Sequence, residues 1–215
     1  MAKLVWDEIG ARKYETGVSK GVLYKQDSTG KYPKGVVWNG LTGVTESPSG
    51  ADATDFWADN INYASVRAAE TFGATVEAYT YPDEFEECDG SASIAEGVKI
   101  GQQARKPFGL CYRTEVGTDT DPTAGYLIHI IYGATASPSQ RAYATINDSP
   151  DAITFSWELS TTPVNVEGYK PTANLIIDST KLEASKLKAL EAVLYGGEST
   201  EARLPLPAEI LTLIA

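Results

Sequence analysis

The chain has 215 residues, of which 42% are apolar and 22% charged, a balance typical of a globular protein that can bury a core. No apolar stretch is long enough to cross a membrane, and the formal net charge of −11 disfavours binding to nucleic-acid phosphates, which proteins contact mainly through Lys and Arg. We expect no secretory signal, because Asp7 and Glu8 come before any apolar core.

Strand signals dominate the chain. Short runs rich in Val, Ile, Thr and Tyr, most of them bounded by Gly, Pro, Asn or Asp, predict strands at residues 20–25, 35–44, 61–69, 73–81, 107–116, 125–136, 140–147, 152–162 and 172–179. The apolar positions from Ile153 to Leu159 alternate with polar ones, which predicts a strand with one buried face. The sequence GYLIHIIYG at 125–133 is apolar on both faces and indicates a central strand or one covered by a partner.

A segment of 17 residues, VTESPSGADATDFWADN at 44–60, interrupts these strands without a helix or strand pattern of its own. We therefore expect a long loop, which in a compact domain is usually functional or disordered. Disordered segments are poor in aromatic residues, yet this one contains Phe56 and Trp57. The two rings must pack either on their own domain or on another subunit.

One α-helix is predicted over about 180–195. Thr180 and Glu183 have the spacing of a capping box, and Gly196 provides a glycine end signal. An apolar stripe connects the two, formed by Leu182, Leu187, Leu190, Val193 and Leu194.

Two further segments have weaker helical signals. A short helix is possible around 83–89. Residues 198–215 predict an extended tail containing Pro205 and Pro207, whose last nine residues, PAEILTLIA, can turn helical. An end this apolar should be docked on the same subunit or on another.

The elements together predict a single domain over residues 1–215. Its expected fold class is mainly β, a β-sandwich or barrel with one flanking α-helix.

The negative charge is concentrated locally. Three stretches hold 12 of the 29 acidic residues and no basic ones, while the rest of the chain has 17 acidic and 18 basic residues. The bland interpretation is a set of soluble loops; the alternative is a shared acidic surface. The acids are Glu46, Asp52, Asp55 and Asp59 in the first stretch, Asp83, Glu84, Glu86, Glu87 and Asp89 in the second, and Glu115, Asp119 and Asp121 in the third.

No catalytic motif emerges, so we expect a protein that is not an enzyme and uses no cofactor. His129, the only histidine, lies in an apolar strand pattern typical of a structural residue, and Cys88 and Cys111 have no metal-ligand spacing. No nucleophile elbow and no phosphate-binding glycine loop is present. Residues 118–125, TDTDPTAG, come nearest to a calcium loop, but Pro122 and the missing downstream Glu break that pattern.

Most of the chain nevertheless resembles the major tail protein, or tail tube protein, of long-tailed, siphovirus-type bacteriophages. The resemblance lies in the order of several stretches rather than in a short signature. These are KLVWDEIGARKYETGVSKGVLY, GVVWNGLTGVTESPSGADATDFWADNINYASV, GATVEAYTYPDEFEECDG, KPFGLCYRTEVGTD, the late helix and RLPLPAEILTLI.

The resemblance implies a structural virion protein that self-assembles into stacked hexameric rings, forming a tube through which genomic DNA passes without specific binding. It implies a location in the virion tail after synthesis in the host cytoplasm. The implied partners are further copies of the chain, a tape-measure protein, a tail terminator and a baseplate or distal tail protein, with no membrane.

The resemblance also suggests roles for the unusual segments. Residues 44–60 would be the loop that stacks one ring on the next, with Phe56 and Trp57 as anchors in a neighbouring subunit. Some carboxylates of 83–89 or 115–121 would line an acidic lumen that repels phosphate. The N-terminus, the 44–60 loop and the C-terminal tail could stay mobile until assembly begins.

Two alternatives remain open at this stage. The chain could be a monomeric β-sandwich module that binds a carbohydrate on Trp38, Trp57 or Trp157. A metal-assisted hydrolase built from the acidic loops has less support.

Overall fold

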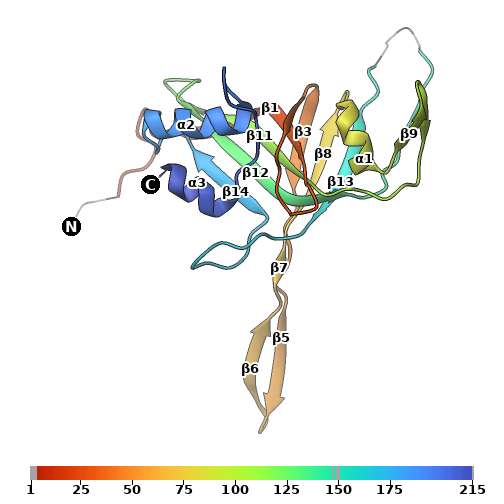
Figure 1. The fold of residues 1–215 in the computed structure, drawn as a ribbon. Coiled ribbons are helices and arrows are strands. Elements are labelled where there is room, and N and C mark those ends of the chain that lie inside the picture. Colours follow the sequence, from red (N-terminus) through yellow and green to blue (C-terminus); the bar gives the residue numbers. More distant parts are fainter. Residues whose placement is uncertain (1–3, 147, 149–150, 215) are drawn as a thin grey trace.

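The computed structural model describes residues 4–146, 148 and 151–214 (Figure 1). The fold is mainly β, with 45% strand and 13% helix, which confirms the expected fold class. One antiparallel sheet of eight strands forms the body, in the order β2-β1-β11-β12-β13-β8-β3, with β14 also paired to β12. Its strands are β1 (Lys13–Lys25), β2 (Gly35–Trp38), β3 (Leu41–Glu46), β8 (Gly73–Ala78), β11 (Phe108–Thr118), β12 (Gly125–Ala136), β13 (Phe155–Thr161) and β14 (Asn174–Asp178).

The sheet curls because its two end strands are consecutive in the chain. β2 ends at Trp38 and β3 begins at Leu41, so Asn39 and Gly40 alone connect the two ends of the seven-strand path. Gly40 has a φ of +77°, which favours glycine in this tight connection. The side chain of Leu41 lies against Gly21 of β1. The result is a barrel-like body.

Alternate residues of the sheet supply two hydrophobic clusters. In β1, Leu23 belongs to the cluster inside the curled sheet, while its neighbours Val22 and Tyr24 belong to the cluster outside it. β12 also contributes to both clusters, with Ile131 in the cluster inside the curled sheet and Ile130 in the cluster outside it. Because β12 pairs with β11, β13 and β14, the two-sided apolar pattern of 125–133 is explained, and the prediction of a central strand is confirmed.

The helices cover the two clusters. A 3-10 turn η1 (Asp83–Phe85) leads into α1 (Glu86–Asp89), as predicted around 83–89, and its buried Phe85 packs on Trp38 and Trp157 of the inner cluster. The helices α2 (Ala184–Tyr195) and α3 (Pro207–Ile214) cover the outer cluster, where Leu190 and Ile210 are buried (Figure 1).

The predicted capping box is wrong. The helix begins at Ala184, and Glu183 at its N-cap makes no side-chain capping bond. Thr180 instead donates its hydroxyl and its backbone N–H to Asp178, which closes a turn before the helix. The predicted end holds, because Gly196 follows Tyr195 with a φ of +82°.

The helix expected at the end of the C-terminal tail is confirmed. Residues 198–206 have a turn and two isolated bridges, Thr200 with Gly197 and Leu204 with Tyr32, and Pro207 then begins α3, since proline is well suited to the first position of a helix. Its apolar face is docked on the body of the same chain, while Ala215 lies outside the described residues.

Three small two-stranded sheets complete the structure. They are β4 (Ser49–Gly50) with β7 (Glu70–Thr71), β5 (Ala53–Ala58) with β6 (Ile61–Arg67), and β9 (Ala92–Ala95) with β10 (Val98–Ile100). The predicted strand at 140–147 is wrong where it is described: residues 140–146 have no regular structure, and Asn147 lies outside the described residues. Arg141 is held by Asp89 of α1 instead of by a neighbouring strand.

Candidate assembly surfaces

A long β-hairpin projects from the body between β3 and β8, and we call residues 47–72 the arm (Figure 1). Its pairing continues the β3–β8 ladder, because Ser47 N donates to Gly73 O and Ser49 then pairs with Thr71. β5 and β6 pair beyond this point up to Ala58 and Ile61. The prediction that 44–60 is a loop without regular structure is therefore wrong.

The tip of the arm is a two-residue turn. Asp59 and Asn60 have φ values of 51° and 62°, the left-handed pair that a type I′ hairpin turn requires. Asp and Asn adopt this conformation more readily than other non-glycine residues. The dipeptide Asp59-Asn60, placed between Ala58 and Ile61, is the sequence signal that could have identified the hairpin.

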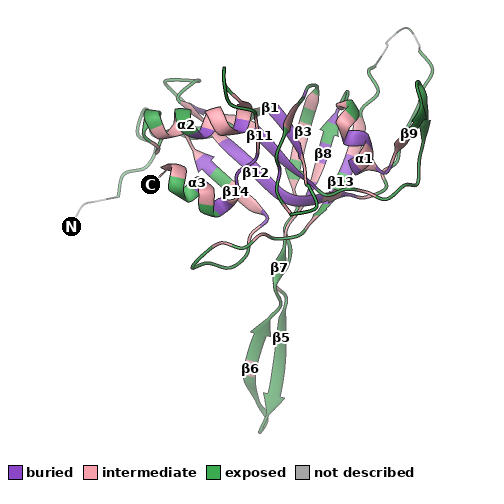
Figure 2. Cartoon of the chain, viewed as in Figure 1, coloured by how far each residue is buried: buried purple, intermediate pink, exposed green. Residues whose placement is uncertain are grey.

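Nearly all of the arm is exposed (Figure 2), and only Ala51, Ala64 and Phe72 are half-buried. Phe56 is 53% exposed and Trp57 is 70% exposed, and Ile61, Tyr63 and Val66 are also large exposed apolar residues. Neither aromatic ring folds back on its own domain, which answers the question left open by the sequence. A two-stranded hairpin is at best marginally stable alone in water, so this surface is suited to a partner.

The register gives the arm two unlike faces. Phe56 pairs with Ala64, Thr54 with Val66, and Ala58 with Ile61, so these alternate positions form an apolar face. Asp55, Trp57, Asn62 and Ser65 lie on the opposite, more polar face. A bulge at Tyr63 separates the tip from the rest of the ladder.

Glu46 fixes the base of the arm to the body. Its carboxylate accepts a hydrogen bond from the Tyr112 hydroxyl at 2.8 Å and one from Asn174 Nδ2 at 3.3 Å. Glu46 is thus not part of the exposed arm, in contrast to Asp52, Asp55 and Asp59, which are exposed along it.

The eight carboxylates predicted as candidates for an acidic lumen do not form one uncompensated cluster. Five form ion pairs with cations of the same chain: Asp83 and Glu86 with Lys99, Glu87 with Lys25 and Lys106, Asp89 with Arg141, and Glu115 with Arg113. The side-chain hydrogen bond from Lys106 is the largest effect that lowers the pKa of Glu87. Asp119 and Asp121 accept backbone N–H groups from Gly10 and Thr123, and within the described chain Glu84 has no such contact.

The N-terminal segment, one of the three segments expected to take part in assembly, is a second exposed apolar surface. Leu4, Val5, Trp6 and Ile9 are all exposed, Trp6 to 74%. The segment is tied to the body only behind these residues, where Gly10 N donates to Asp119 and Asp119 N donates to Arg12 O.

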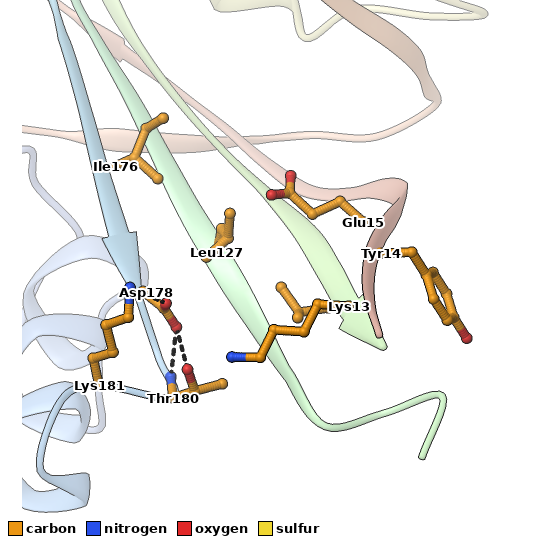
Figure 3. Close-up of a pocket in the computed structure, with 9 residues that line it drawn as sticks. Lys13, Tyr14, Glu15, Leu127, Ile176, Asp178, Thr180 and Lys181 are labelled. Atoms are coloured by element: carbon orange, nitrogen blue, oxygen red, sulfur yellow. Dashed lines mark hydrogen bonds and ion pairs between the residues drawn. The ribbon is translucent and has the colours of Figure 1, made fainter. Parts of the chain in front are cut away.

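Figure 3 shows a groove beside the end of β14, which we call the sheet-face groove. Its volume is about 570 Å³ and its floor is apolar, formed by Val116, Leu127 and Ile176. The side chain of Lys13 extends across it (Figure 3). At its rim Asp178 pairs with Lys181 at 3.2 Å, and the hydroxyl of Thr180 is the main cause that lowers the pKa of Asp178.

A larger groove of about 890 Å³ lies at the base of the arm, and we call it the arm-base groove. One wall is the arm and the other is the loop before β14. Its residues are Ala51, Arg67, Ala68, Ala69, Glu70, Phe72, Pro163, Lys170, Pro171, Thr172, Ala173 and Asn174.

Two of the three tryptophans considered as a carbohydrate platform are core residues. Trp38 is 2% exposed and donates to Thr80 O, and Trp157 is 1% exposed and donates to Asp89. Burial excludes both from stacking on a sugar, so of these three tryptophans Trp57, at the arm, is the one exposed enough to do so.

No group of three or more His, Cys, Asp or Glu side chains among the described residues could hold a metal ion. No described helix is long and apolar enough to span a bilayer.

No known protein family and no curated protein matches this sequence. Among solved structures, the chain is similar to a chain of the sheath–tube complex of an extracellular contractile injection system, termed PVC, in its extended state. The similarity covers 74% of this chain and 88% of that chain, with 11% sequence identity and a TM-score of 0.32. A score this low describes only a loose resemblance of the two backbones.

Proposed function

We propose that this chain is a structural subunit of a phage-type tail tube, which assembles with copies of itself into stacked hexameric rings. The observation that carries the proposal is the arm, a hairpin on which Phe56, Trp57, Ile61, Tyr63 and Val66 are all more than half exposed. Each of its strands has about 12 residues, so the arm reaches about 40 Å beyond the body. Such an extension is long enough to enter a neighbouring subunit.

The position of the arm favours stacking. The arm leaves the body on the side away from α2 (Figure 1). In a stack, the arm of one copy would therefore contact a different surface on the next copy. Contacts of this head-to-tail kind repeat without limit unless a rotation closes them into a ring. In the proposal, the arm joins successive rings through Phe56 and Trp57.

Within a ring, sheet edges would pair between neighbouring subunits. β14 offers such an edge, because among the described strands it pairs with β12 alone. Unpaired strand edges are sites at which another chain can add main-chain hydrogen bonds. The hexameric number comes from the sequence resemblance.

The tube would carry genomic DNA without holding it. A bore lined by carboxylates repels phosphate and lets the duplex slide. Glu84, Asp119 and Asp121 are the candidates for this role that have no ion-pair partner in the described part of the chain. The further proposed partners are a tape-measure protein, a tail terminator and a baseplate component, and the proposed role is not catalytic.

Negative-stain electron microscopy of the purified protein across a range of concentrations tests the proposal. We expect rings or hollow tubes at high concentration, and loss of the tubes in Trp57→Ala. Tyr169→Ala is the matched control, because Tyr169 is an equally exposed aromatic residue outside the arm. Monomers at every concentration, alone and after co-expression with neighbouring tail proteins, would contradict the proposal.

A further inference from the structure

We propose that the N-terminal segment, residues 4–9, docks in the arm-base groove of a second copy of this chain. The inference rests on the proposed self-assembly but concerns a contact different from the one made by the tip of the arm. It starts from two surfaces that each lack a partner.

The segment has an amphipathic sequence without a surface to pack on. Leu4, Val5, Trp6 and Ile9 are more than 60% exposed, which is unusual for four large apolar residues so close together. Removing apolar side chains of this size from water is favourable in proportion to the apolar area that is buried. A docked segment would therefore be much more stable than the exposed one.

The arm-base groove has the size and lining that such a segment needs. Its volume of about 890 Å³ falls in the range of roughly 300–1,000 Å³ typical of ligand pockets. Among its lining residues Phe72 is half-buried and Ala173 is buried, and the exposed Ala68, Ala69 and Pro171 have small or ring-shaped side chains. These small side chains leave room for an extended peptide beside Arg67 and Lys170.

The charges of the two surfaces are complementary. Asp7 and Glu8 follow Trp6 and have no ion-pair partner among the described residues. Arg67 and Lys170 stand on opposite walls of the groove, likewise without an ion-pair partner in the described chain, against the single carboxylate of Glu70. A segment of charge −2 thus meets a groove of charge +1, which favours this occupant over a basic or neutral peptide.

The occupant is a second copy because of where the two surfaces lie in one chain. The segment leaves the body near one end of α2 and projects outward, away from the base of the arm (Figure 1). Gly10 and Arg12 are fixed to the turn at Asp119, which is joined to the start of β12, whereas the groove adjoins the start of β14 opposite Ile131. In a head-to-tail stack, the arm of one subunit and the segment of the next would meet at the same junction.

Chemical cross-linking between two single-cysteine variants tests the contact. The native Cys88 and Cys111 are buried, so Val5→Cys and Ala68→Cys provide the reactive thiols. The two variants are mixed, assembled and treated with a short bis-maleimide. We expect a covalent two-chain product from this mixture, but not when Ser93→Cys, on the exposed and distant β9–β10 hairpin, replaces Ala68→Cys.

Charge exchange gives a second readout that does not depend on cysteine reactivity. Asp7→Lys with Glu8→Lys in the Val5→Cys chain should reduce the cross-linked product several-fold. Arg67→Glu with Lys170→Glu in the Ala68→Cys chain should restore it. Restoration is not expected if the first change merely alters the folding of the segment.

Each outcome decides the inference. Cross-linking only when both cysteines are in one chain would mean that the segment folds back on its own groove, and would overturn the inference. Tubes that form without the two-chain product would overturn it as well, but leave the proposed function standing. If neither tubes nor cross-links form, alone and after co-expression with neighbouring tail proteins, both proposals fail.

Discussion

Nδ1 of His129 lies 3.6 Å from Oε1 of Glu46, so the buried imidazole faces the carboxylate at the point where the arm leaves the body. The ring also stacks on Tyr112, with 4.6 Å between centroids, and Nε2 lies 2.9 Å from the Thr114 hydroxyl. Three strands of the sheet, β3, β11 and β12, are joined by this cluster. The protonation of His129 therefore bears on how firmly the arm is held.

The first prediction concerns pH. Burial lowers the pKa of His129 below its usual value of 6.5, although Glu46 and Glu15 act in the opposite direction. As pH falls below about 6.5, the unfolded chain takes up a proton at this residue more readily than the folded chain, so the free energy of unfolding should fall. Each unit between the two pKa values corresponds to about 1.4 kcal/mol. Urea unfolding at pH 5 to 8 should show this loss, and His129→Gln should flatten it.

Carboxylates provide the internal control for this experiment. Ion pairing and hydrogen bonding lower the pKa values of Glu87, through Lys106 first, and of Glu209, through Arg203 first. These carboxylates stabilise the fold above pH 4.5, the pKa of a glutamate in the unfolded chain, and this stabilisation is lost as pH falls below 4.5. The window is separate from that of His129, so His129→Gln should leave it unchanged. An unaltered slope between pH 7 and 5 in the variant would contradict the assignment to His129.

The second prediction concerns the tip of the arm. Asn60 has a φ of 62°, a conformation that costs a non-glycine residue about 1 kcal/mol. Asn60→Gly removes this cost and should slow hydrogen exchange of the arm amides, while Asn60→Val should accelerate it, because β-branched residues tolerate positive φ poorly. Amides of β11 and β12 serve as the reference and should not change. Equal exchange in both variants would mean that the turn does not control the pairing of β5 with β6.

The arm also shows why part of the fold could not be predicted from sequence. The alternation between Trp157 and Leu159 predicted a strand because one face of β13 packs in the core of the same chain. In β5 every residue is exposed, so burial imposed no alternation on the segment around Phe56 and Trp57. A strand whose partner surface is in another molecule lacks the pattern on which strand prediction depends.

The acidic residues illustrate a second limit. Asp89 was one of a run of acids without a neighbouring cation in sequence, but the fold brings Arg141 to it from 52 residues away. In sequence Glu46 groups with Asp52 and Asp55, but at the end of β3 its side chain faces the body and accepts a hydrogen bond from Tyr112. A local run of acidic residues therefore predicts an acidic surface only where the fold brings no distant cation to neutralise it.

The third prediction concerns the point where β12 divides between two partner strands. Gly133 has a φ of +57°, donates its N–H to the Tyr32 hydroxyl at 2.8 Å, and lies so close to Thr162 O that a Cβ would collide with it. Gly133→Ala should therefore be strongly destabilising, by more than the roughly 1–2 kcal/mol of the left-handed conformation alone. Gly17→Ala is the matched control, because Gly17 has a φ of +69° and open space around it. Thermal or urea unfolding of both variants measures the difference, and equal losses would contradict a steric role for Thr162.

The fourth prediction concerns the carboxylate that anchors the segment after β12. Asp89 pairs through one oxygen with Arg141 and accepts from Trp157 Nε1 at 3.2 Å through the other. The guanidinium lies 5.5 Å from the ring centroids of Tyr81 and Phe155, so the pair is partly shielded from water. Asp89→Ala should cost about 2 kcal/mol in the free energy of unfolding, in line with hydrogen bonds to charged groups.

A double-mutant cycle separates the ion pair from the hydrogen bond to the indole. If the pair dominates, Asp89→Ala combined with Arg141→Ala should cost much less than the sum of the two single changes. Asp119→Ala, which removes an exposed carboxylate that accepts from Gly10 N, should cost well under 1 kcal/mol. Additive effects would instead mean that Asp89 acts mainly through Trp157. In that case proteolysis of residues 137–146 should be no faster in Asp89→Ala than in the parent chain, because their anchor would not depend on Asp89.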